Sequence, residues 1–149
     1  PYWNLESTAP YLPMEHLSII AYFSVACFPD GSLVTTCVNG YCGDKNGWDG
    51  WNSATLANLV SRAHQSGVKV VLTIKNFDKP SIENLITSPD AQNRLIANII
   101  SEISAKNADG VNIDFEYIGT ASSGLRAAFA AFSDKVADAV HAGAPSPPK

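Results

Sequence analysis

The chain alternates between apolar runs and segments with helical spacing. Residues 17–26 (LSIIAYFSVA) and 68–74 are almost continuously apolar and rich in β-branched or aromatic side chains, which is typical of strands covered on both faces. In residues 110–117, apolar and polar positions alternate, as they do in a strand with two unlike faces. The pattern therefore predicts three strands separated by helices.

The predicted helices have clear start signals. Asn52 or Ser53 can cap a helix after the first strand, and Ser88-Pro89-Asp90 is a strong start signal for a helix after the second. A third helix follows the last strand and is expected to stop at Gly143 and Pro145. Apolar residues at helical spacing support all three helices: Leu56, Leu59, Val60 and Ala63; Leu95, Ile96, Ile99, Ile100 and Ile103; and Leu125, Phe129, Phe132, Val136 and Val140.

Successive strand–helix units predict an α/β fold with parallel strands joined by right-handed crossovers. Two architectures fit this pattern, an open doubly wound sheet and a (β/α)8 barrel. No Gly-x-Gly-x-x-Gly follows a predicted strand, so the dinucleotide-binding form of the open sheet has no support. A complete barrel needs about 250 residues, so the 149 residues of this chain would form only part of one.

The composition narrows the function classes. Charged residues make up 16% of the chain and the net charge is −4, with no cluster of Lys and Arg. Nucleic acids and anionic membranes are therefore not expected as partners. No run approaches the roughly 20 apolar residues that a membrane span needs. No residue pattern points to a cofactor.

Residues 32–52 are rich in glycine and are expected to form a long loop, with or without a hairpin. Within it, Cys37 and Cys42 frame a short Gly-containing segment. Either a small disulfide or reduced thiols fit the sequence, and Cys27 is unpaired in both cases. No metal site is expected, because no histidine lies nearby in sequence and polar loop residues are usually solvated. If the loop did bind calcium, its candidate ligands would be Asp44, Asn46 and Asp49.

The chemistry is concentrated in residues 109–117 (DGVNIDFEY). Side chains alternate between the faces of a strand, so Asn112, Asp114 and Glu116 share one face. Two carboxylates on a buried face are costly to desolvate and repel each other, so one is expected to keep its proton to higher pH than a free side chain. That property suits a general acid. The alternative is an edge strand whose polar face is simply solvated.

Residues 109–116 resemble the fourth-strand signature of family 18 glycoside hydrolases, the chitinases and endo-N-acetylglucosaminidases, whose pattern is Asp-x-x-Asp-x-Asp-x-Glu. The resemblance extends along the chain: Tyr2-Trp3 resembles the end of the first strand, 17–26 the second and 68–76 the third. It implies a partial (β/α)8 TIM barrel, from the end of strand 1 through helix 4. Residues 1–149 would then be one incomplete catalytic domain, the N-terminal half of the barrel, with no second domain.

By this resemblance, Glu116 protonates the leaving glycosidic oxygen. The 2-acetamido carbonyl of the substrate is the nucleophile and forms an oxazolinium intermediate, while Asp114 orients the acetamido group and balances its charge. Asn112 completes the catalytic set and can hydrogen-bond Asp114. Aromatic rings suit the apolar side of a pyranose, and strand ends face the substrate. Substrate contacts are therefore expected from Tyr2, Trp3, Lys75, Asn76 and Tyr117, with Trp48 and Trp51 as weaker candidates.

The second predicted strand ends in Thr73-Ile74-Lys75-Asn76-Phe77, whereas many chitinases have Ser-x-Gly-Gly there. Position 112 is Asn where the more common pattern has Asp. Both departures resemble the spore-cortex and cell-wall lytic branch of the family. The resemblance thus implies a retaining hydrolase of β-1,4-linked N-acetylglucosamine glycans, either chitin or peptidoglycan, that is secreted or associated with the cell wall, although no signal peptide is visible.

A chitinase-like lectin, which binds such glycans without cleaving them, is the alternative. Lectins of this kind generally lose the acid, so the presence of Asp114 and Glu116 favours the enzyme. We expect these 149 residues alone to show weak or no hydrolysis. Open strand edges of a half barrel would also favour self-association.

Overall fold

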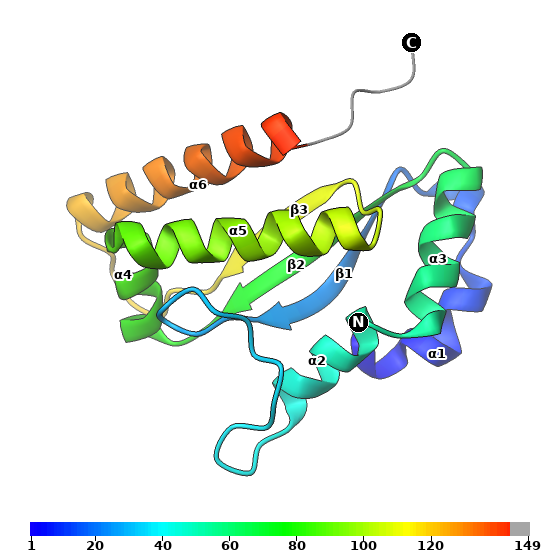
Figure 1. Cartoon of the computed structure of the whole chain (residues 1–149), viewed down its shortest axis with the longest axis horizontal. Helices are drawn as coiled ribbons and strands as arrows, with labels where there is room; N and C mark the ends of the chain where they lie inside the picture. The colour runs from blue at the N-terminus through cyan, green and yellow to red at the C-terminus, as the bar shows by residue number, and fades with distance from the viewer. Residues whose placement is uncertain (144–149) are drawn as a thin grey trace.

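Three parallel strands and their connecting helices make up the computed structural model, which describes residues 1–143 (Figure 1). The strands are β1 (Ile19–Ala26), β2 (Lys69–Asn76) and β3 (Gly110–Phe115). The α-helices are α1 (Leu5–Thr8), α2 (Gly43–Trp51), α3 (Ala54–Gln65), α4 (Lys79–Thr87), α5 (Pro89–Ala105) and α6 (Ser123–Gly143). Short 3-10 helices precede β1, namely η1 (Tyr2–Asn4), η2 (Ala9–Tyr11) and η3 (Met14–His16).

The sheet confirms the predicted α/β alternation. β2 lies between β1 and β3, and both pairings are parallel. Each connection between neighbouring strands passes through helices. Strands that follow one another in the sequence are therefore neighbours in the sheet, which is the order that a barrel requires.

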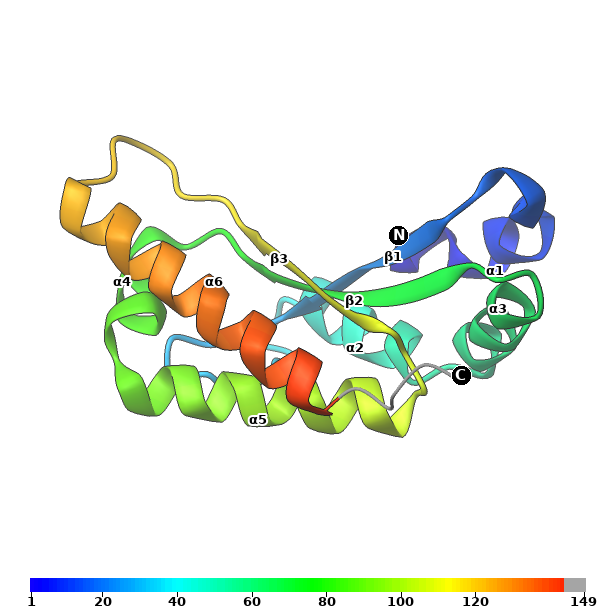
Figure 2. The same ribbon diagram turned by 90° about the horizontal axis from the view of Figure 1, so that it is seen from above.

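The core lies between the sheet and the helices on one side of it. Figure 2 shows α2, α5 and α6 on the same side of the strands. On β2, Val70, Leu72 and Ile74 are fully buried on that side, because alternate side chains of a strand share a face. The opposite face carries Lys75 of β2 beside Asp114 of β3.

Two helices begin at the predicted capping residues. The Ser53 hydroxyl accepts a hydrogen bond from the Leu56 N–H at 3.1 Å, at the start of α3. The Ser88 hydroxyl accepts one from the Ala91 N–H at 3.4 Å, at the start of α5. These caps satisfy N–H groups that the first turn of a helix leaves without a partner. The predicted stop at Pro145 lies outside the described residues.

The glycine-rich stretch 32–52 is not a loop throughout, because it contains α2. Glycine disfavours a helix in isolation, but here it allows α2 to lie close to β1. A Cβ on Gly47 would be 2.2 Å from the Ser24 carbonyl oxygen. Across this contact the Tyr22 hydroxyl donates to the Gly47 carbonyl at 2.7 Å, and Trp51 at the end of α2 is fully buried. Tertiary packing therefore outweighs local propensity in α2.

Two further expectations differ from the structure. A helix, α4, follows β2 where only a break was expected; Asp78 caps it and Pro80 lies in its first turn, a combination that favours a helix start. Tyr2 and Trp3 lie in the 3-10 helix η1 rather than at the end of a strand. Tyr2 packs against Gly50 of α2 instead of pairing with β1.

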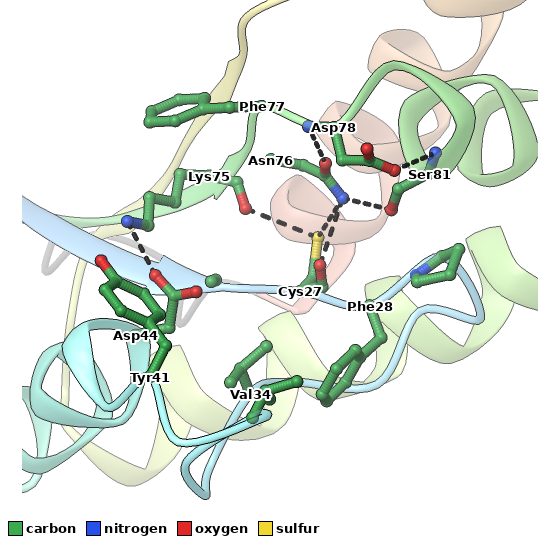
Figure 3. A pocket seen from close by; sticks show the side chains of 13 residues that line it. Cys27, Phe28, Val34, Tyr41, Asp44, Lys75, Asn76, Phe77, Asp78 and Ser81 are labelled. Atoms are coloured by element: carbon green, nitrogen blue, oxygen red, sulfur yellow. Dashed lines mark hydrogen bonds and ion pairs between the residues drawn. The ribbon is translucent and has the colours of Figure 1, made fainter.

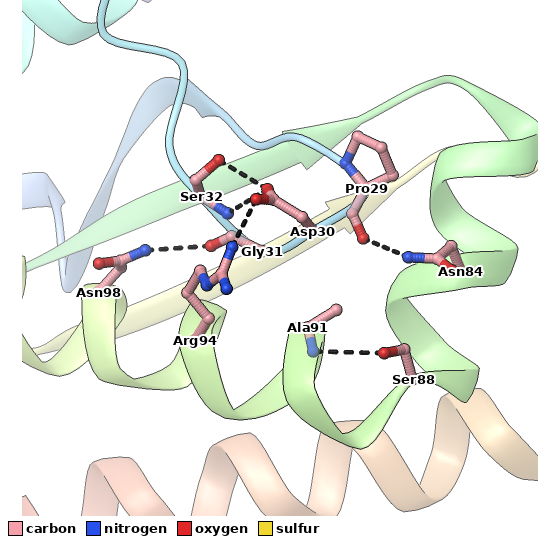
Figure 4. Close-up of polar contacts among 9 residues, drawn as sticks. All are labelled: Pro29, Asp30, Gly31, Ser32, Asn84, Ser88, Ala91, Arg94 and Asn98. Atoms are coloured by element: carbon pink, nitrogen blue, oxygen red, sulfur yellow. Dashed lines mark hydrogen bonds and ion pairs between the residues drawn. The ribbon is translucent and has the colours of Figure 1, made fainter.

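The turn after β1, residues 29–32, is tied to α4 and α5 (Figure 4). The side-chain amides of Asn84 and Asn98 donate to two carbonyl oxygens of the turn, at 2.6 and 3.0 Å. Asp30 forms an ion pair with Arg94 at 2.5 Å. These contacts anchor the end of β1 to the helices that follow β2.

We predict that Gly31→Ala destabilises the fold by about 3 kcal/mol. Gly31 has a φ of 85°, and a Cβ there would lie 2.1 Å from the Ala91 carbonyl oxygen. The substitution therefore combines left-handed strain with a backbone clash. Gly40→Ala is the matched control, because Gly40 has a φ of 80° with no atom within 4 Å of the added Cβ. Urea denaturation compares the two variants, and equal losses of stability would contradict the prediction.

Within residues 1–143, β1 and β3 are the outer strands of the sheet, and each has a neighbouring strand on one side. Unpaired strand edges favour association between chains. The self-association expected from the sequence therefore stays a prediction. Among the described helices, none has both the length and the apolar character needed to cross a membrane.

Candidate active site

The polar residues of β3 lead toward the C-terminal end of the sheet. Asn112 and Asp114 lie in β3, and Glu116 follows directly after the strand ends. The Glu116 N–H donates to the Asn76 carbonyl oxygen at 3.0 Å, which continues the pairing of β2 with β3. The alternation of side chains therefore holds Glu116 on the same face as Asp114.

This face is more open than the sequence indicated. Asn112 and Glu116 are exposed and Asp114 is half-buried, because β3 is an outer strand of the described sheet. The expected burial of two carboxylates is therefore wrong for residues 1–143. Within the same residues, no side chain donates a hydrogen bond to either carboxylate. Both groups are accessible to a ligand.

The first residue of the motif, Asp109, has a structural role. Its Oδ2 accepts a hydrogen bond from the Val70 N–H at 2.7 Å and lies 2.8 Å from Nε2 of His64. These contacts join the start of β3 to β2 and to α3. His64 is half-buried.

Lys75 pairs with Asp114 in the register of β2 and β3. Its ammonium group forms an ion pair with Asp44 of α2 at 2.9 Å, and its side chain is only 14% exposed. The same group lies 5.9 Å from the ring centre of Phe23 and 5.4 Å from that of Phe77. The carboxylate and the ring faces together stabilise a charge that is largely removed from water. Lys75 thus connects the face of Asp114 with α2.

The polar groups of Asn76 and Tyr117 are engaged within the protein, although Asn76 also lines a cavity at the end of β2. Asn76 is buried, and its amide donates to the Cys27 carbonyl at 3.1 Å and to the Ser81 hydroxyl at 2.6 Å. Tyr117 donates its hydroxyl to Glu83 of α4 at 2.5 Å. Strand alternation directs both side chains away from the candidate carboxylates, and their role as substrate contacts stays a prediction.

The other predicted aromatic contacts fall into two groups. Trp3 is 60% exposed and its ring centre lies 5.9 Å from that of Phe23, in an edge-on arrangement. Tyr2 is half-buried beside Trp3. Trp51 is fully buried and donates its indole N–H to Glu102 at 2.9 Å, so a stacking role for Trp51 is wrong. Trp3 is the aromatic residue of this set that a ligand can reach most freely.

A cavity of about 590 Å³ opens at the C-terminal ends of β1 and β2 (Figure 3). Asp44 and Lys75 bring charges to its wall, and Tyr41 and Phe77 bring aromatic rings. The sequence did not single out Tyr41 or Phe77 as contacts, because each is an isolated aromatic residue. For Tyr41, the sequence did contain a signal: the preceding Asn39-Gly40 pair is typical of a tight hairpin turn, which would expose the residues beside it.

Cys37 and Cys42 form a disulfide, which decides between the two alternatives for this pair. Cys27 is free and buried. Its Sγ lies 3.8 Å from the Asn76 amide nitrogen. Burial raises the pKa of Cys27 to about 12, so the thiol is protonated at neutral pH and is a poor nucleophile.

Both acidic residues among the candidate calcium ligands form ion pairs with lysines. Asp44 pairs with Lys75, and Asp49 pairs with Lys45. Within residues 1–143, no group of three His, Cys, Asp or Glu side chains could hold a metal ion.

The sheet and its helices match those of solved glycan-cleaving enzymes. A chitinase from Bacteroides thetaiotaomicron matches 90% of this chain with a TM-score of 0.67 and 21% sequence identity. The Bacillus cereus spore cortex-lytic enzyme SleL matches 96% with a TM-score of 0.66 and 20% identity. A chitinase from Rhizomucor miehei matches 91% with a TM-score of 0.61 and 19% identity. The chain shares its fold with part of a chitinase.

The chain spans 38%, 29% and 40% of these three structures, respectively. No protein-family model matches the sequence, and no curated protein sequence matches it. At such identities, the likeness to chitinases establishes the fold. What the site does depends on its residues and not on the fold alone.

We predict that Cys27 resists alkylation in the folded protein at about pH 9, the pKa of an ordinary thiol. The unfolded chain has that ordinary pKa, so the stability gained by keeping the thiol protonated is complete below about pH 9 and is lost as the pH rises toward the folded value of about 12. Iodoacetamide labelling with and without urea measures the difference, and the disulfide leaves Cys27 as the thiol to follow. Rapid labelling of the folded protein at about pH 9 would overturn the prediction.

Proposed function

We propose that the protein is a retaining glycoside hydrolase of β-1,4-linked N-acetylglucosamine glycans, either chitin or peptidoglycan. One observation carries the proposal. Asn112, Asp114 and Glu116 follow one another along an accessible sheet face, within a fold shared with chitinases. Asp114 and Glu116 match the last two positions of the Asp-x-x-Asp-x-Asp-x-Glu pattern that the sequence resembles, and Asn112 stands where the more common pattern has Asp.

In the proposed reaction, Glu116 is the general acid. It protonates the glycosidic oxygen as the bond to the leaving sugar breaks, while the acetamido carbonyl oxygen of the substrate attacks the anomeric carbon. The resulting oxazolinium ion is then opened by water with retention of configuration. Because the acetamido group supplies the nucleophile, a second nucleophilic carboxylate is not required.

Asp114 orients the acetamido group and balances the charge of the oxazolinium ion. Its neighbour Asn112 donates its amide N–H to the Thr73 hydroxyl at 3.3 Å. The Asn112 carbonyl oxygen is then left to accept a hydrogen bond from Asp114 when that carboxyl is protonated. Asn112 is therefore assigned a supporting role, and it cannot exchange a proton with Asp114 as an aspartate could.

We further propose that residues 1–149 belong to one catalytic domain, part of a (β/α)8 barrel, with β1, β2 and β3 as its second, third and fourth strands. The sequential order of the strands supports this assignment, as does the fold shared with chitinases. In a barrel the face of Asp114 would point inward, and Glu116 would lie at the C-terminal rim. We propose Trp3, which is 60% exposed, and Lys75, which pairs with Asp114 in the strand register, as substrate contacts at this rim.

The proposed substrate implies that the protein is secreted or associated with the cell wall. Chitin and peptidoglycan lie outside the cytoplasm, and one of the matched structures is a spore cortex-lytic enzyme. The Cys37–Cys42 disulfide also fits an oxidising environment.

A glycan-binding lectin is the second candidate function. The exposed Trp3 and Tyr41 side chains favour it, because exposed aromatic rings serve binding whether or not cleavage follows. Binding without turnover by a protein that carries the complete barrel would support the lectin and remove the hydrolase proposal.

We predict that Glu116→Gln lowers kcat by about 10²–10⁴ while oligosaccharide binding is retained, because the amide keeps the shape of the side chain but supplies no proton. In a protein that carries the complete barrel, hydrolysis of chito-oligosaccharides and of peptidoglycan measures turnover, and calorimetry measures binding. Glu15→Gln is the control, because Glu15 is an exposed carboxylate in η3. Full activity of Glu116→Gln would refute the assignment of the acid.

We also predict weak or no hydrolysis by these 149 residues alone. In the described residues Glu116 is exposed to solvent, and transition-state charges are stabilised far less in water than in an enclosed site. The assay uses the isolated chain at several concentrations, with its mass in solution measured in parallel. Robust turnover by a monomer would show the prediction to be wrong.

A further inference from the structure

The cavity of Figure 3 lies beside the candidate carboxylates, yet its lining residues take no part in the proposed proton transfer. Tyr41, on its wall, is 61% exposed. Tyr41 and Phe77 both line this cavity, and aromatic faces on a cavity wall suit the apolar side of a sugar ring.

Tyr41 belongs to a small hairpin with a fixed backbone. Val38 and Tyr41 exchange two backbone hydrogen bonds, at 3.0 and 2.9 Å. Between them Asn39 and Gly40 have φ values of 49° and 80°, as a type I′ turn requires. The Cys37–Cys42 disulfide links the next pair of residues. The hairpin is therefore held in shape before any ligand arrives, which reduces the entropy lost on binding.

The Tyr41 ring is positioned against the start of α2. A Cβ on Gly43 would lie 2.2 Å from the Tyr41 hydroxyl oxygen, so the glycine leaves room for the ring. The next residue of α2, Asp44, holds the Lys75 ammonium group, which in turn lies 5.4 Å from the Phe77 ring centre. Figure 3 shows the Asp44–Lys75 pair between the rings of Tyr41 and Phe77.

We propose that this cavity is a second sugar-binding subsite and that Tyr41 is its platform, a residue that determines preference for longer glycan chains. The inference rests on the proposed function. Asp44 and Lys75 neutralise each other, so the wall offers ring faces and hydrogen-bonding groups rather than a net charge from this pair. These features suit an uncharged pyranose with its hydroxyl and acetamido groups.

The position of the subsite is continuous with the candidate active site but separate from it. Lys75 lines the cavity and is also the register partner of Asp114. The end of β1, from which the cavity opens, is two strands away from β3, which corresponds to about 10 Å at the usual strand spacing. A sugar residue stacked on Tyr41 would therefore be a different residue of the glycan from the one whose bond is broken at Glu116.

Chain-length dependence tests the proposal in the natural protein. Tyr41→Ala is expected to lower kcat/KM for N-acetylglucosamine hexasaccharide by about tenfold, with a much smaller fall for a disaccharide aryl glycoside. Tyr41→Phe keeps the ring and is expected to stay within about twofold of wild type. Tyr11→Ala is the control, because Tyr11 is 83% exposed in η2 and lies outside the cavity lining.

Oligosaccharide binding by the Glu116→Gln variant, with and without Tyr41→Ala, separates this inference from the proposed function. If Tyr41→Ala weakens hexasaccharide binding there, the subsite is supported whether or not the wild-type protein cleaves. Equal losses for hexasaccharide and disaccharide would indicate a general structural role and overturn the platform. Unchanged binding and turnover of both ligands would also overturn it, while leaving Glu116 as the acid.

Discussion

The alternation of side chains on β3 puts Asp114 and Glu116 on one face, and the register against β2 decides whether that face is the open one. Contacts at both ends of the strand fix that register. At its start, Asp109 accepts the Val70 N–H, and at its end the Glu116 N–H donates to the Asn76 carbonyl. A shift by one residue would turn Asp114 and Glu116 toward the helices and bring apolar residues to the open face. The backbone pairing of two strands therefore decides whether this chain has a candidate site at all.

The position of β1 is set by a different kind of contact. Gly47 allows α2 to approach β1 more closely than a side chain would permit, and the buried Tyr22 and Trp51 fill the space around that approach. With α2 in place, Asp44 reaches Lys75 of β2. Segments that are far apart in the sequence are thereby joined at one end of the sheet. The wall of the cavity is a consequence of how closely one helix packs.

The sequence predicted most of the secondary structure and the face that carries Asn112, Asp114 and Glu116, because both depend on local periodicity. It did not predict α2, since glycine in a helix is favoured only by a neighbour that the sequence does not show. It also favoured a buried polar face over the solvated edge strand that was its alternative, because exposure depends on how many strands surround the face.

The individual contact residues were predicted with less success, for a related reason. Asn76 and Lys75 are adjacent in the sequence and both end β2, yet they point to opposite faces, and the amide of Asn76 is used within the protein. Tyr117 was expected near the acid, but alternation along the strand carries it to α4. Periodicity places a set of residues on a face, whereas the partner of each side chain is decided by tertiary packing.

The hairpin from Cys37 to Cys42 begins and ends at almost the same point, with the two Cα atoms 4.3 Å apart. A segment whose ends meet in this way can be lengthened, shortened or exchanged without displacing the elements on either side of it. β1 and α2 would stay in place while the hairpin carried a different tip. Substitutions, insertions or deletions in the hairpin can thus change the residues that face a ligand, while the sheet and α2 keep their positions.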